Sequence, residues 1–484
     1  MTETNLYAPV AEQVARNPDA IAMRFGDRQV SYGDFDRLVT QAARMLIAHG
    51  VGSDDRVAGM LAKTPEALAL TLGTFRIGAV YVPINPGFTE GELDFVLRDA
   101  EPSLVVTDKP ADLPFPNLLL SDMAQHDGPA PQMTPGGNTC ASMLYTSGTT
   151  GRPKGARMSH RNILDSFSAF NRIWGITDKD VFLHVLPTYH AHGLLMATLC
   201  PLYAGAQIVM TARFDIDEVL KLLPQVNAMM AVPTVWGRLA DHPGFDGHGL
   251  RLATSGSAPL SPELYDRLLA KGVMLADRYG STEAGMIAAN PVGASRRGSV
   301  GRVLPGVEMR LAGENGAAVP QGEIGRIQAR GAHVFLGYWR RPELDGQSAT
   351  ADGWFDTGDF GKLDDEGYLY IVGRDKDMII SGGFNVYPRE VELALEQSPD
   401  VAEAVVFGVP HPDFGEGVVA ALKLAPGAKL DEDALRDLQT RTIASYKRPK
   451  RLFVVEDFPR NGMGKILRKD LAQQFANAFV SVQV

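Results

Sequence analysis

The stretch Leu144-Tyr145-Thr146-Ser147-Gly148-Thr149-Thr150-Gly151-Arg152-Pro153-Lys154-Gly155 decides how the rest of the chain is interpreted. Residues 141–144 predict the end of a short buried strand, and Ser159 is a suitable N-cap for a following helix. A strand, a glycine-rich loop and a helix in this order are typical of phosphate binding, because glycines let backbone N–H groups approach and hydroxyls and lysine add donors. The stretch is not a Walker A loop, because no glycine-lysine-Ser/Thr closes it at the required spacing. A flexible surface loop is the alternative interpretation.

Length and composition indicate a multidomain globular protein. A chain of 484 residues is too long for one core, and 45% hydrophobic with 21% charged residues is an ordinary globular composition. The net charge of -10 argues against nucleic acid or an anionic membrane as the main partner. Cys140 and Cys200 lie far apart without metal-ligand spacing, which predicts a reducing compartment and no structural zinc. Residues 1–14 lack the features of a signal peptide, so we expect a cytoplasmic location.

The order of the predicted elements indicates an α/β fold joined to a smaller α+β unit. Helical and strand patterns alternate over residues 7–110, which predicts a mostly parallel sheet with helices on its faces. From about residue 297, short strands between turns predict a small antiparallel barrel. We therefore expect a large N-terminal domain of αβ-layered subdomains plus that barrel over residues 1–373, a hinge over 374–376 and a small mobile α+β lid domain over 377–484.

One apolar segment, residues 193–210, is long enough to raise the question of a membrane span. Pro201, Gly205 and Gln207 interrupt it. We expect a buried helix, a turn and a buried strand, and no membrane span.

Three further polar motifs follow predicted strands. Residues 187–194 contain His190 and His192, which lack a third ligand at a metal-binding spacing, so a substrate pocket is favoured over a metal site. Gly256-Ser257-Ala258 and the segment from Arg278 to Glu283 each follow a strand. Both would lie at the carboxyl edge of a parallel sheet, where open α/β sheets bind ligands. Each motif alone is weak, because single charges and aromatics are more often surface and core residues.

The ordered set of motifs resembles the adenylate-forming superfamily, which contains acyl-CoA synthetases, peptide adenylation domains and luciferases. The set comprises residues 145–155, Gly256 to Pro259, Tyr279 to Glu283, Thr357-Gly358-Asp359, Tyr368 with Gly373-Arg374, and Gly464-Lys465. The resemblance covers nearly the whole chain. It implies an AMP-forming acid–thiol ligase that uses ATP, Mg²⁺, coenzyme A and a small-molecule carboxylate.

The resemblance also implies roles for individual residues. Thr146, Ser147, Gly148, Thr149, Thr150 and Lys154 would bind the phosphates of ATP. Thr282 would contact the α-phosphate and Glu283 would hold Mg²⁺, which prefers oxygen ligands. Tyr279 would stack on adenine, beside Gly256, Ser257, Ala258, Gly280 and Ser281. Asp359 and Arg374 would bind the ribose. Lys465 would bridge the carboxylate and the α-phosphate.

Members of this superfamily use two arrangements of the small domain, one for each half-reaction. The hinge would be Lys376, and rotation would replace Lys465 by the segment Ser381-Gly382-Gly383-Phe384, next to pantetheine. A hairpin turn is the structural alternative for Gly382-Gly383, and the two interpretations are compatible. Acetylation of Lys465, set by a lysine acetyltransferase and a deacetylase, would remove the charge that the first half-reaction needs.

Within the superfamily the sequence looks most like malonyl-CoA synthetases. The similarity rests on residues 187–194, on Arg278 directly before Tyr279, and on residues 381–388. It implies that Arg278 holds the distal carboxylate, with His192 in the same pocket. Ser281 stands where many of those enzymes have methionine, which predicts room for methylmalonate. The alternatives are a CoA ligase for another short, medium-chain or aromatic monocarboxylate, an enzyme that loads a carrier protein, a luciferase-like oxygenase, and an inactive scaffold.

Overall fold

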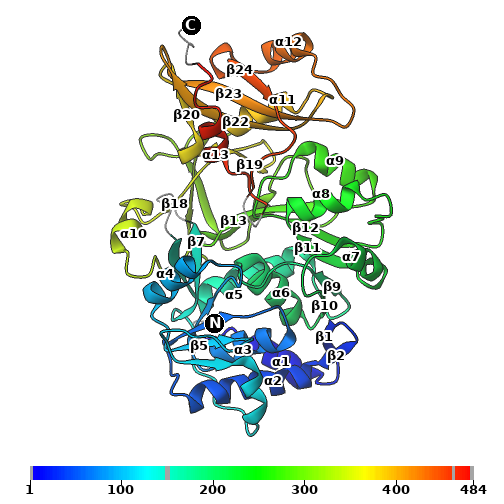
Figure 1. Ribbon diagram of the computed structural model, residues 1–484, viewed down its shortest axis with the longest axis vertical. Coiled ribbons are helices and arrows are strands. Elements are labelled where there is room, and N and C mark those ends of the chain that lie inside the picture. Colours follow the sequence, from blue (N-terminus) through cyan, green and yellow to red (C-terminus); the bar gives the residue numbers. More distant parts are fainter. Residues whose placement is uncertain (1–3, 148–152, 461–463, 480–484) are drawn as a thin grey trace.

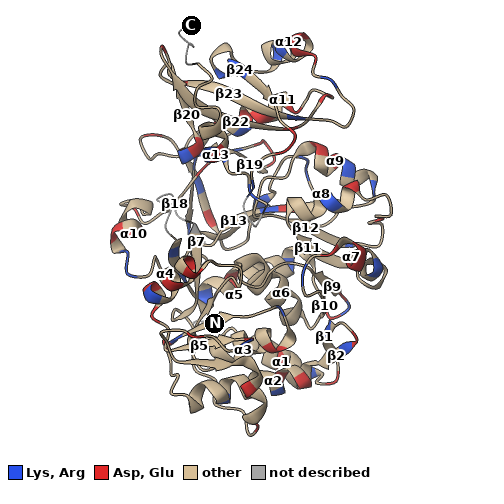
Figure 2. Cartoon of the chain, in the orientation of Figure 1, with Lys and Arg blue, Asp and Glu red and all other residues tan. Residues whose placement is uncertain are grey.

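The structure is a computed structural model, and it describes residues 4–147, 153–460 and 464–479. Figure 1 shows a large N-terminal domain and, above it, a small C-terminal domain that carries β20 and β22–β24. This is the expected combination of a layered α/β domain with a small α+β domain. Figure 2 shows acidic and basic residues interspersed along the chain in both domains.

The largest sheet has nine strands and positions most of the candidate site. Its order is β15 (Arg302–Val303), β14 (Gly285–Ala289), β13 (Leu275–Ser281), β12 (Leu252–Ser255), β11 (Ala228–Ala231), β9 (Val181–His184), β10 (Gln207–Met210), β1 (Ile21–Phe25) and β2 (Arg28–Ser31). The strands from β13 to β1 are parallel, and the flanking pairs are antiparallel. Every residue of β11 and β12 is buried, as expected for a sheet that is covered on both faces.

A second sheet of six strands forms the first lobe together with its helices. Its order is β6 (Asn117–Leu119), β5 (Leu104–Thr107), β3 (Arg56–Met60), β4 (Val80–Pro83), β7 (Cys140–Ser147) and β8 (Pro153–Ser159). One hydrophobic core cluster contains residues of this lobe and of the nine-stranded sheet, so the two lobes pack as one body.

The glycine-rich loop differs from the prediction in one respect. It joins β7 to β8, which pair antiparallel with Thr146 opposite Lys154, and a helix begins only afterwards at His160. The strand β8, which stands between the loop and the helix, was not predicted from the sequence. Residues 153–159 are held extended by pairing with β7, and a Cβ on Gly155 would lie 2.9 Å from Met143 Sδ, so a larger residue there would require Met143 to shift. The predicted cap is confirmed: Ser159 Oγ accepts from the N–H of Asn162 in a capping box.

The helices cover the faces of these sheets and carry the expected apolar stripes. In the large domain they are α1 (Ala8–Arg16), α2 (Tyr32–Ala48), α3 (Pro65–Arg76), α4 (Glu90–Ala100), α5 (His160–Trp174), α6 (Ala197–Ala204), α7 (Ile216–Leu222), α8 (Pro233–Asp241), α9 (Pro262–Ala270) and α10 (Pro342–Ser348). The predicted apolar segment forms a π-helical turn (His192–Met196), α6 and β10, all mostly buried. Within the described ranges, no helix is long and apolar enough to cross a membrane.

An antiparallel sheet of four strands lies between the large sheet and the small domain. Its order is β16 (Glu308–Ala312), β17 (Gly325–Arg330), β18 (Phe355–Leu363) and β19 (Leu369–Arg374). Hydrogen bonds from Val300 N to Leu369 O (2.9 Å) and from Leu369 N to Gly301 O (2.8 Å) join β19 to the segment before β15. The strands thus enclose a separate core with β14, which gives the barrel-like unit that the sequence predicts.

The small domain is built on a five-stranded sheet. It contains β20 (Ile379–Ser381), β21 (Phe384–Val386), β22 (Val401–His411), β23 (Gly415–Leu424) and β24 (Arg451–Val454). The helices α11 (Pro388–Leu395) and α12 (Glu432–Thr442) share one core cluster with this sheet, and α13 (Arg468–Gln474) belongs to a second one. Helices therefore cover both faces.

Candidate active site

The candidate site lies at the carboxyl edge of the nine-stranded sheet. The neighbouring strands β9, β11, β12 and β13 all end there. The loops that follow β9 and β12 carry residues 187–192 and 256–258, and β13 ends in the turn before β14. This is the edge at which open α/β sheets bind ligands, and most of the predicted site residues meet at it.

The predicted phosphate and metal residues are connected by hydrogen bonds. Thr146 Oγ1, at the end of β7, donates to Glu283 Oε1 at 3.1 Å, and Tyr338 Oη donates to the same oxygen at 3.1 Å. Lys154 Nζ lies over the Tyr338 ring, 5.4 Å from its centroid. Ser147 ends β7, whereas Gly148, Thr149 and Thr150 lie outside the described residues.

The turn between β13 and β14 presents Thr282 and Glu283. Gly280 lies directly against β14, and a Cβ there would approach Gly285 O to 2.3 Å, so the hairpin requires glycine. Ser281 Oγ accepts from the N–H of Ala284 at 2.9 Å, which shapes the turn. The Ser281 hydroxyl therefore has a local structural partner. Thr282 is half-buried in the same turn.

The predicted nucleoside residues form a second hydrogen-bonded group. Tyr279 Oη donates to Asp359 Oδ2 at 2.6 Å, and Arg374 Nε donates to Asp359 Oδ1 at 2.7 Å. Asp359 is only 2% exposed, so this pairing gives a nearly buried carboxylate a counter-charge and fixes its orientation. Burial, together with the neighbouring carboxylate, raises the pKa of the Tyr279 hydroxyl far above its usual value, so it remains a donor at all ordinary pH values.

Lys465 belongs to the small domain but lies at this second group. Burial, with Arg374 and Lys376 nearby, lowers its pKa to about 8. The preceding Gly464 has a φ of +75°, and a Cβ there would approach Thr234 Cγ2 of α8 to 2.2 Å. Only glycine allows this approach without a shift, because L residues are disfavoured at this φ and no room exists for a side chain. In this structure the loop that carries Lys465 therefore lies against the large domain.

A buried basic cluster lies on the other side of the site. The guanidinium of Arg278 is 5% exposed and covers Gly256, where a Cβ would lie 2.8 Å from Arg278 Cζ. His192 Nδ1 lies 3.2 Å from Ser257 Oγ, and Ser257 has a φ of +71°, which is strained for a residue other than glycine. Ala258 follows in the same loop and is half-buried. The structure thus places His192 close enough to Arg278 for the Arg278 charge to act on its ring.

The cluster has an unusual electrostatic balance. Burial lowers the pKa of Arg278 to about 10, and burial together with the Arg278 charge lowers the pKa of His192 well below its usual value. Arg278 is thus charged and His192 neutral at pH 7. Among the described residues, Arg278 Nε and His192 Nε2 have no hydrogen-bond partner, and Arg278 Nη1 contacts only a weak acceptor, Met286 Sδ, at 3.5 Å. A buried cation with unused donors is costly unless an anion binds beside it.

The predicted coenzyme A segment is not brought to this cluster. It forms the β20–β21 hairpin of the small domain, with Gly382 against Phe414 and the exposed Phe384 ring stacked on Tyr446 at 4.7 Å. Gly382 and Gly383 both have positive φ, so the predicted hairpin turn is confirmed. Ser381 is buried and pairs with Gly415, and Lys376 lies in the 3₁₀ turn before β20.

Three contributors to the site were not found from the sequence. Tyr338 binds Glu283, Thr234 receives Gly464, and Arg460 donates to Gly464 O at 3.1 Å and to Glu403 at 2.6 Å. Each lies far in the chain from at least one of its partners. Only Arg460 had a usable signal, because it stands in the loop that leads to Lys465.

Comparison with known proteins agrees with this geometry. The family profile described as AMP-binding enzyme matches residues 10–339, and that of the AMP-binding enzyme C-terminal domain matches residues 390–465. A feruloyl-CoA synthase of Amycolatopsis sp. is 34% identical over 95% of this chain and 96% of the relative. The mitochondrial malonate–CoA ligase of Mus musculus is 34% identical over 94% and 89%, respectively. The crystal structure of ATP-bound MatB from Rhodopseudomonas palustris superposes with a TM-score of 0.92 at 37% identity, over 98% of this chain and 100% of MatB.

Two family profiles, full-length relatives and a hydrogen-bonded arrangement of the predicted residues thus agree. The chain belongs to the AMP-binding family of adenylate-forming enzymes, as an acid–CoA ligase with similarity to the malonate–CoA ligases.

Proposed function

We propose that this enzyme joins a short dicarboxylate to coenzyme A at the expense of ATP, with malonate as the preferred acid and methylmalonate as a second substrate. In the first step, a carboxylate oxygen of the acid attacks the α-phosphorus of ATP, and the bond to pyrophosphate breaks. In the second step, the thiol of coenzyme A loses its proton and attacks the acyl carbon, and AMP leaves with the electron pair of the broken C–O bond. The products are the thioester, AMP and pyrophosphate.

The observation that carries the choice of acid is the buried guanidinium of Arg278. A distal carboxylate would supply the anion that this cation lacks, through charge-assisted hydrogen bonds to its unused donors. The adjacent Asp277 is a poor counter-ion, because burial raises its pKa to about 7 and its Oδ1 accepts from the backbone N–H of Arg278. A monocarboxylate would leave the buried charge without a partner.

The first half-reaction would take place between the two domains. Lys465 would place its positive charge between the acid carboxylate and the α-phosphate, where negative charges meet in the transition state. Two unit charges 4 Å apart interact with about 4 kcal/mol at an effective dielectric constant near 20, so this lysine would contribute a large electrostatic effect. Asp359 and Arg374 would orient the ribose, and Tyr279 would present its ring to the adenine.

The described residues fit a magnesium ion that is bound by one protein carboxylate together with phosphate oxygens of ATP. Within the described ranges, no group of three or more His, Cys, Asp or Glu side chains is placed to hold a metal ion. The Glu283 carboxylate, held by Thr146 and Tyr338, provides a single oriented ligand. Mg²⁺ is commonly bound through one or two carboxylates plus phosphate oxygens. Glu283 would therefore hold an ion that arrives with ATP, and that ion would neutralise phosphate charge.

The second half-reaction would require a rotation of residues 377–484 about a hinge at 374–376. In the observed arrangement, Asp375 pairs with Arg326 of β17 at 2.6 Å and Asp377 pairs with Arg468 of α13 at 3.5 Å. Rotation would rearrange the Asp375–Arg326 pair and leave the Asp377–Arg468 pair intact, because both of its partners belong to the moving domain. It would also withdraw Lys465 and bring the β20–β21 hairpin to the acyl-adenylate. Acetylation of Lys465 stays a prediction, and retained adenylation in a fully acetylated sample would contradict it.

A panel of acids tests the proposal. AMP release would be measured with ATP, Mg²⁺ and coenzyme A for malonate, methylmalonate, succinate, acetate, propionate, a medium-chain fatty acid and a hydroxycinnamate. Preference for malonate or methylmalonate is expected. Preference for a hydroxycinnamate would instead favour an aromatic acid, which the similarity to a feruloyl-CoA synthase makes the second candidate. Release of AMP that does not depend on coenzyme A, but on a carrier protein, would identify a carrier-loading enzyme.

A further inference from the structure

A buried lysine of the first lobe lies next to the loop that carries His192. Lys63 stands between β3 and α3 and is 5% exposed. Its ammonium donates to His184 O at 2.8 Å and to Leu186 O at 3.0 Å. Burial lowers the pKa of Lys63 to about 7, which shows how unfavourable this location is for a charge. The two carbonyl contacts and the more distant charge of Glu218 partly offset that cost.

The carbonyls that Lys63 holds belong to His184, the last residue of β9, and to Leu186 in the acid-pocket loop, which comprises residues 185–193. The ring of His184 continues the connection, because its Nε2 lies 3.0 Å from Gly193 O and 3.2 Å from Thr198 Oγ1. A Cβ on Gly193 would lie 2.0 Å from Pro187 O, so the loop folds back tightly on its own beginning. His192 is thus the penultimate residue of a loop that is held at both ends.

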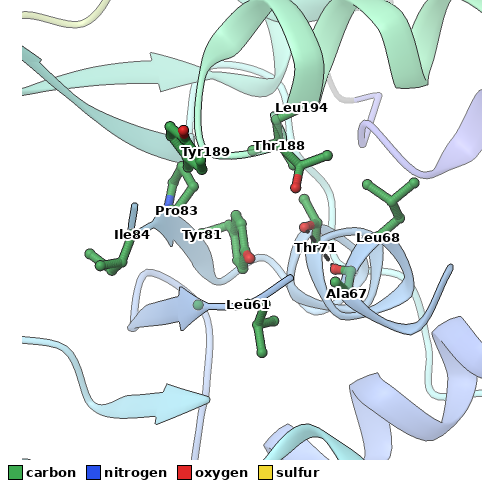
Figure 3. Close-up of a pocket in the computed structure, with 11 residues that line it drawn as sticks. Leu61, Ala67, Leu68, Thr71, Tyr81, Pro83, Ile84, Thr188, Tyr189 and Leu194 are labelled. Atoms are coloured by element: carbon green, nitrogen blue, oxygen red, sulfur yellow. Dashed lines mark hydrogen bonds between the residues drawn. The ribbon is translucent and has the colours of Figure 1, made fainter. Parts of the chain in front are cut away.

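The same loop packs against the first lobe close to Lys63. Figure 3 shows Thr188, Tyr189 and Leu194 on one side of a small cavity, with residues of β4 and α3 on the other. The cavity measures about 10 Å³, roughly the space of one water molecule. The loop therefore has little freedom to shift along this contact, which combines apolar side chains with the hydroxyl groups of Thr71, Thr188 and Tyr189.

We propose that Lys63 is a positioning residue for the acid pocket: its ammonium holds the acid-pocket loop and so determines where His192 stands relative to Arg278 and Ser257. Lys63 makes its contacts through the loop backbone and does not touch the acid. The predicted nucleotide residues lie on other elements, on β7, β8, β13, β18, β19 and the loop after β12, and of these Ser257 alone is hydrogen-bonded to His192 among the described residues. Loss of the ammonium would leave Leu186 O without this donor, and the loop would shift, which would weaken acid binding selectively. The inference rests on the proposed function, because it assumes that the acid binds beside His192.

The test compares Lys63→Met with the wild type in the full-length chain. Initial rates of AMP release would give kcat and separate KM values for the acid and for ATP, with thermal unfolding measured in parallel. We expect the KM for the acid to rise about tenfold while the KM for ATP stays within twofold. Lys63→Arg keeps a donor and should recover part of the acid KM. The matched control is Lys109→Met, an exposed lysine of the same lobe, which should match the wild type.

A second variant keeps the inference testable if Lys63→Met does not fold. Thr198→Val removes the hydroxyl that donates to Gly193 O at 3.0 Å, at the other end of the loop. It should raise the KM for the acid about threefold and leave the KM for ATP unchanged. Equal increases of both KM values in the variants, or no increase in either, would overturn the inference while the proposed function stands. A wild-type enzyme that activates no acid would overturn both together, and wild-type turnover with a different acid would change only the acid used in the test.

Discussion

Replacement of Arg278 by methionine is the sharpest test of the acid pocket. Methionine keeps much of the side-chain volume over Gly256 and removes the charge and all five donors. Arg278 is 5% exposed, so the distal carboxylate of malonate would be left in a buried site without a counter-charge. Removing one partner of a buried charge pair costs about 2–5 kcal/mol. At 1.36 kcal/mol per factor of ten, this corresponds to a loss of roughly 30- to 5,000-fold in kcat/KM for malonate.

Two comparisons separate this effect from general damage. Propionate has no distal charge, so its kcat/KM should change little or improve in the variant. The dissociation constant of ATP, measured by calorimetry, should stay within twofold, because Tyr279 and Asp359 keep their hydrogen bond. The free energy of unfolding should not fall, because removing a buried, poorly partnered charge does not cost stability. Arg297→Met serves as the matched control, since Arg297 is exposed and pairs with Asp266.

The reasoning fails if malonate and propionate lose activity by the same factor. It also fails if kcat/KM for malonate falls less than threefold. Either result would move the distal carboxylate away from Arg278 and leave the adenylation chemistry intact.

Four further predictions concern the metal ligand Glu283 and the loop that carries Lys465. Lys465 must be charged to act, and its pKa is lowered to about 8. Therefore kcat/KM for pyrophosphate release should fall about tenfold per pH unit above pH 8. A flat profile up to pH 9.5 would contradict this prediction. Glu283→Gln weakens the metal ligand and should raise the Mg²⁺ concentration for half-maximal rate several-fold. The dissociation constant of ATP measured without metal should change little. Arg460→Gln removes a charge-assisted bond to Gly464 O, worth about 1.5–3 kcal/mol before allowance for partial exposure. Adenylation should slow about tenfold, while thioester formation from added acyl-adenylate should continue. Equal loss in both half-reactions would refute this prediction. Gly464→Ala should slow adenylation in the same selective way, and Thr234→Ala in the same chain should recover part of the rate.

The sequence was most informative where chemistry depends on neighbours within a few residues. The cap at Ser159, the turn glycines at 382 and 383 and the helix–strand alternation all follow from local rules, and the structure confirms them. The segment 153–159 was missed because its extended form comes from pairing with β7, a partner on the far side of the loop. The hydrophobic periodicity of residues 153–159 does not indicate that they pair with β7.

The sequence alone determined the set of reactive groups and their order along the chain, because motif spacing and residue chemistry do not depend on tertiary contacts. What only the tertiary structure decided is which of these groups meet. Thr146 and Glu283 are 137 residues apart, His192 and Ser257 are 65 apart, and Lys63 contacts a carbonyl 121 residues away. The order of strands in the sheets brings these pairs together, and that order depends on the packing of the whole core. The burial that leaves Arg278 charged and short of partners arises from the same packing.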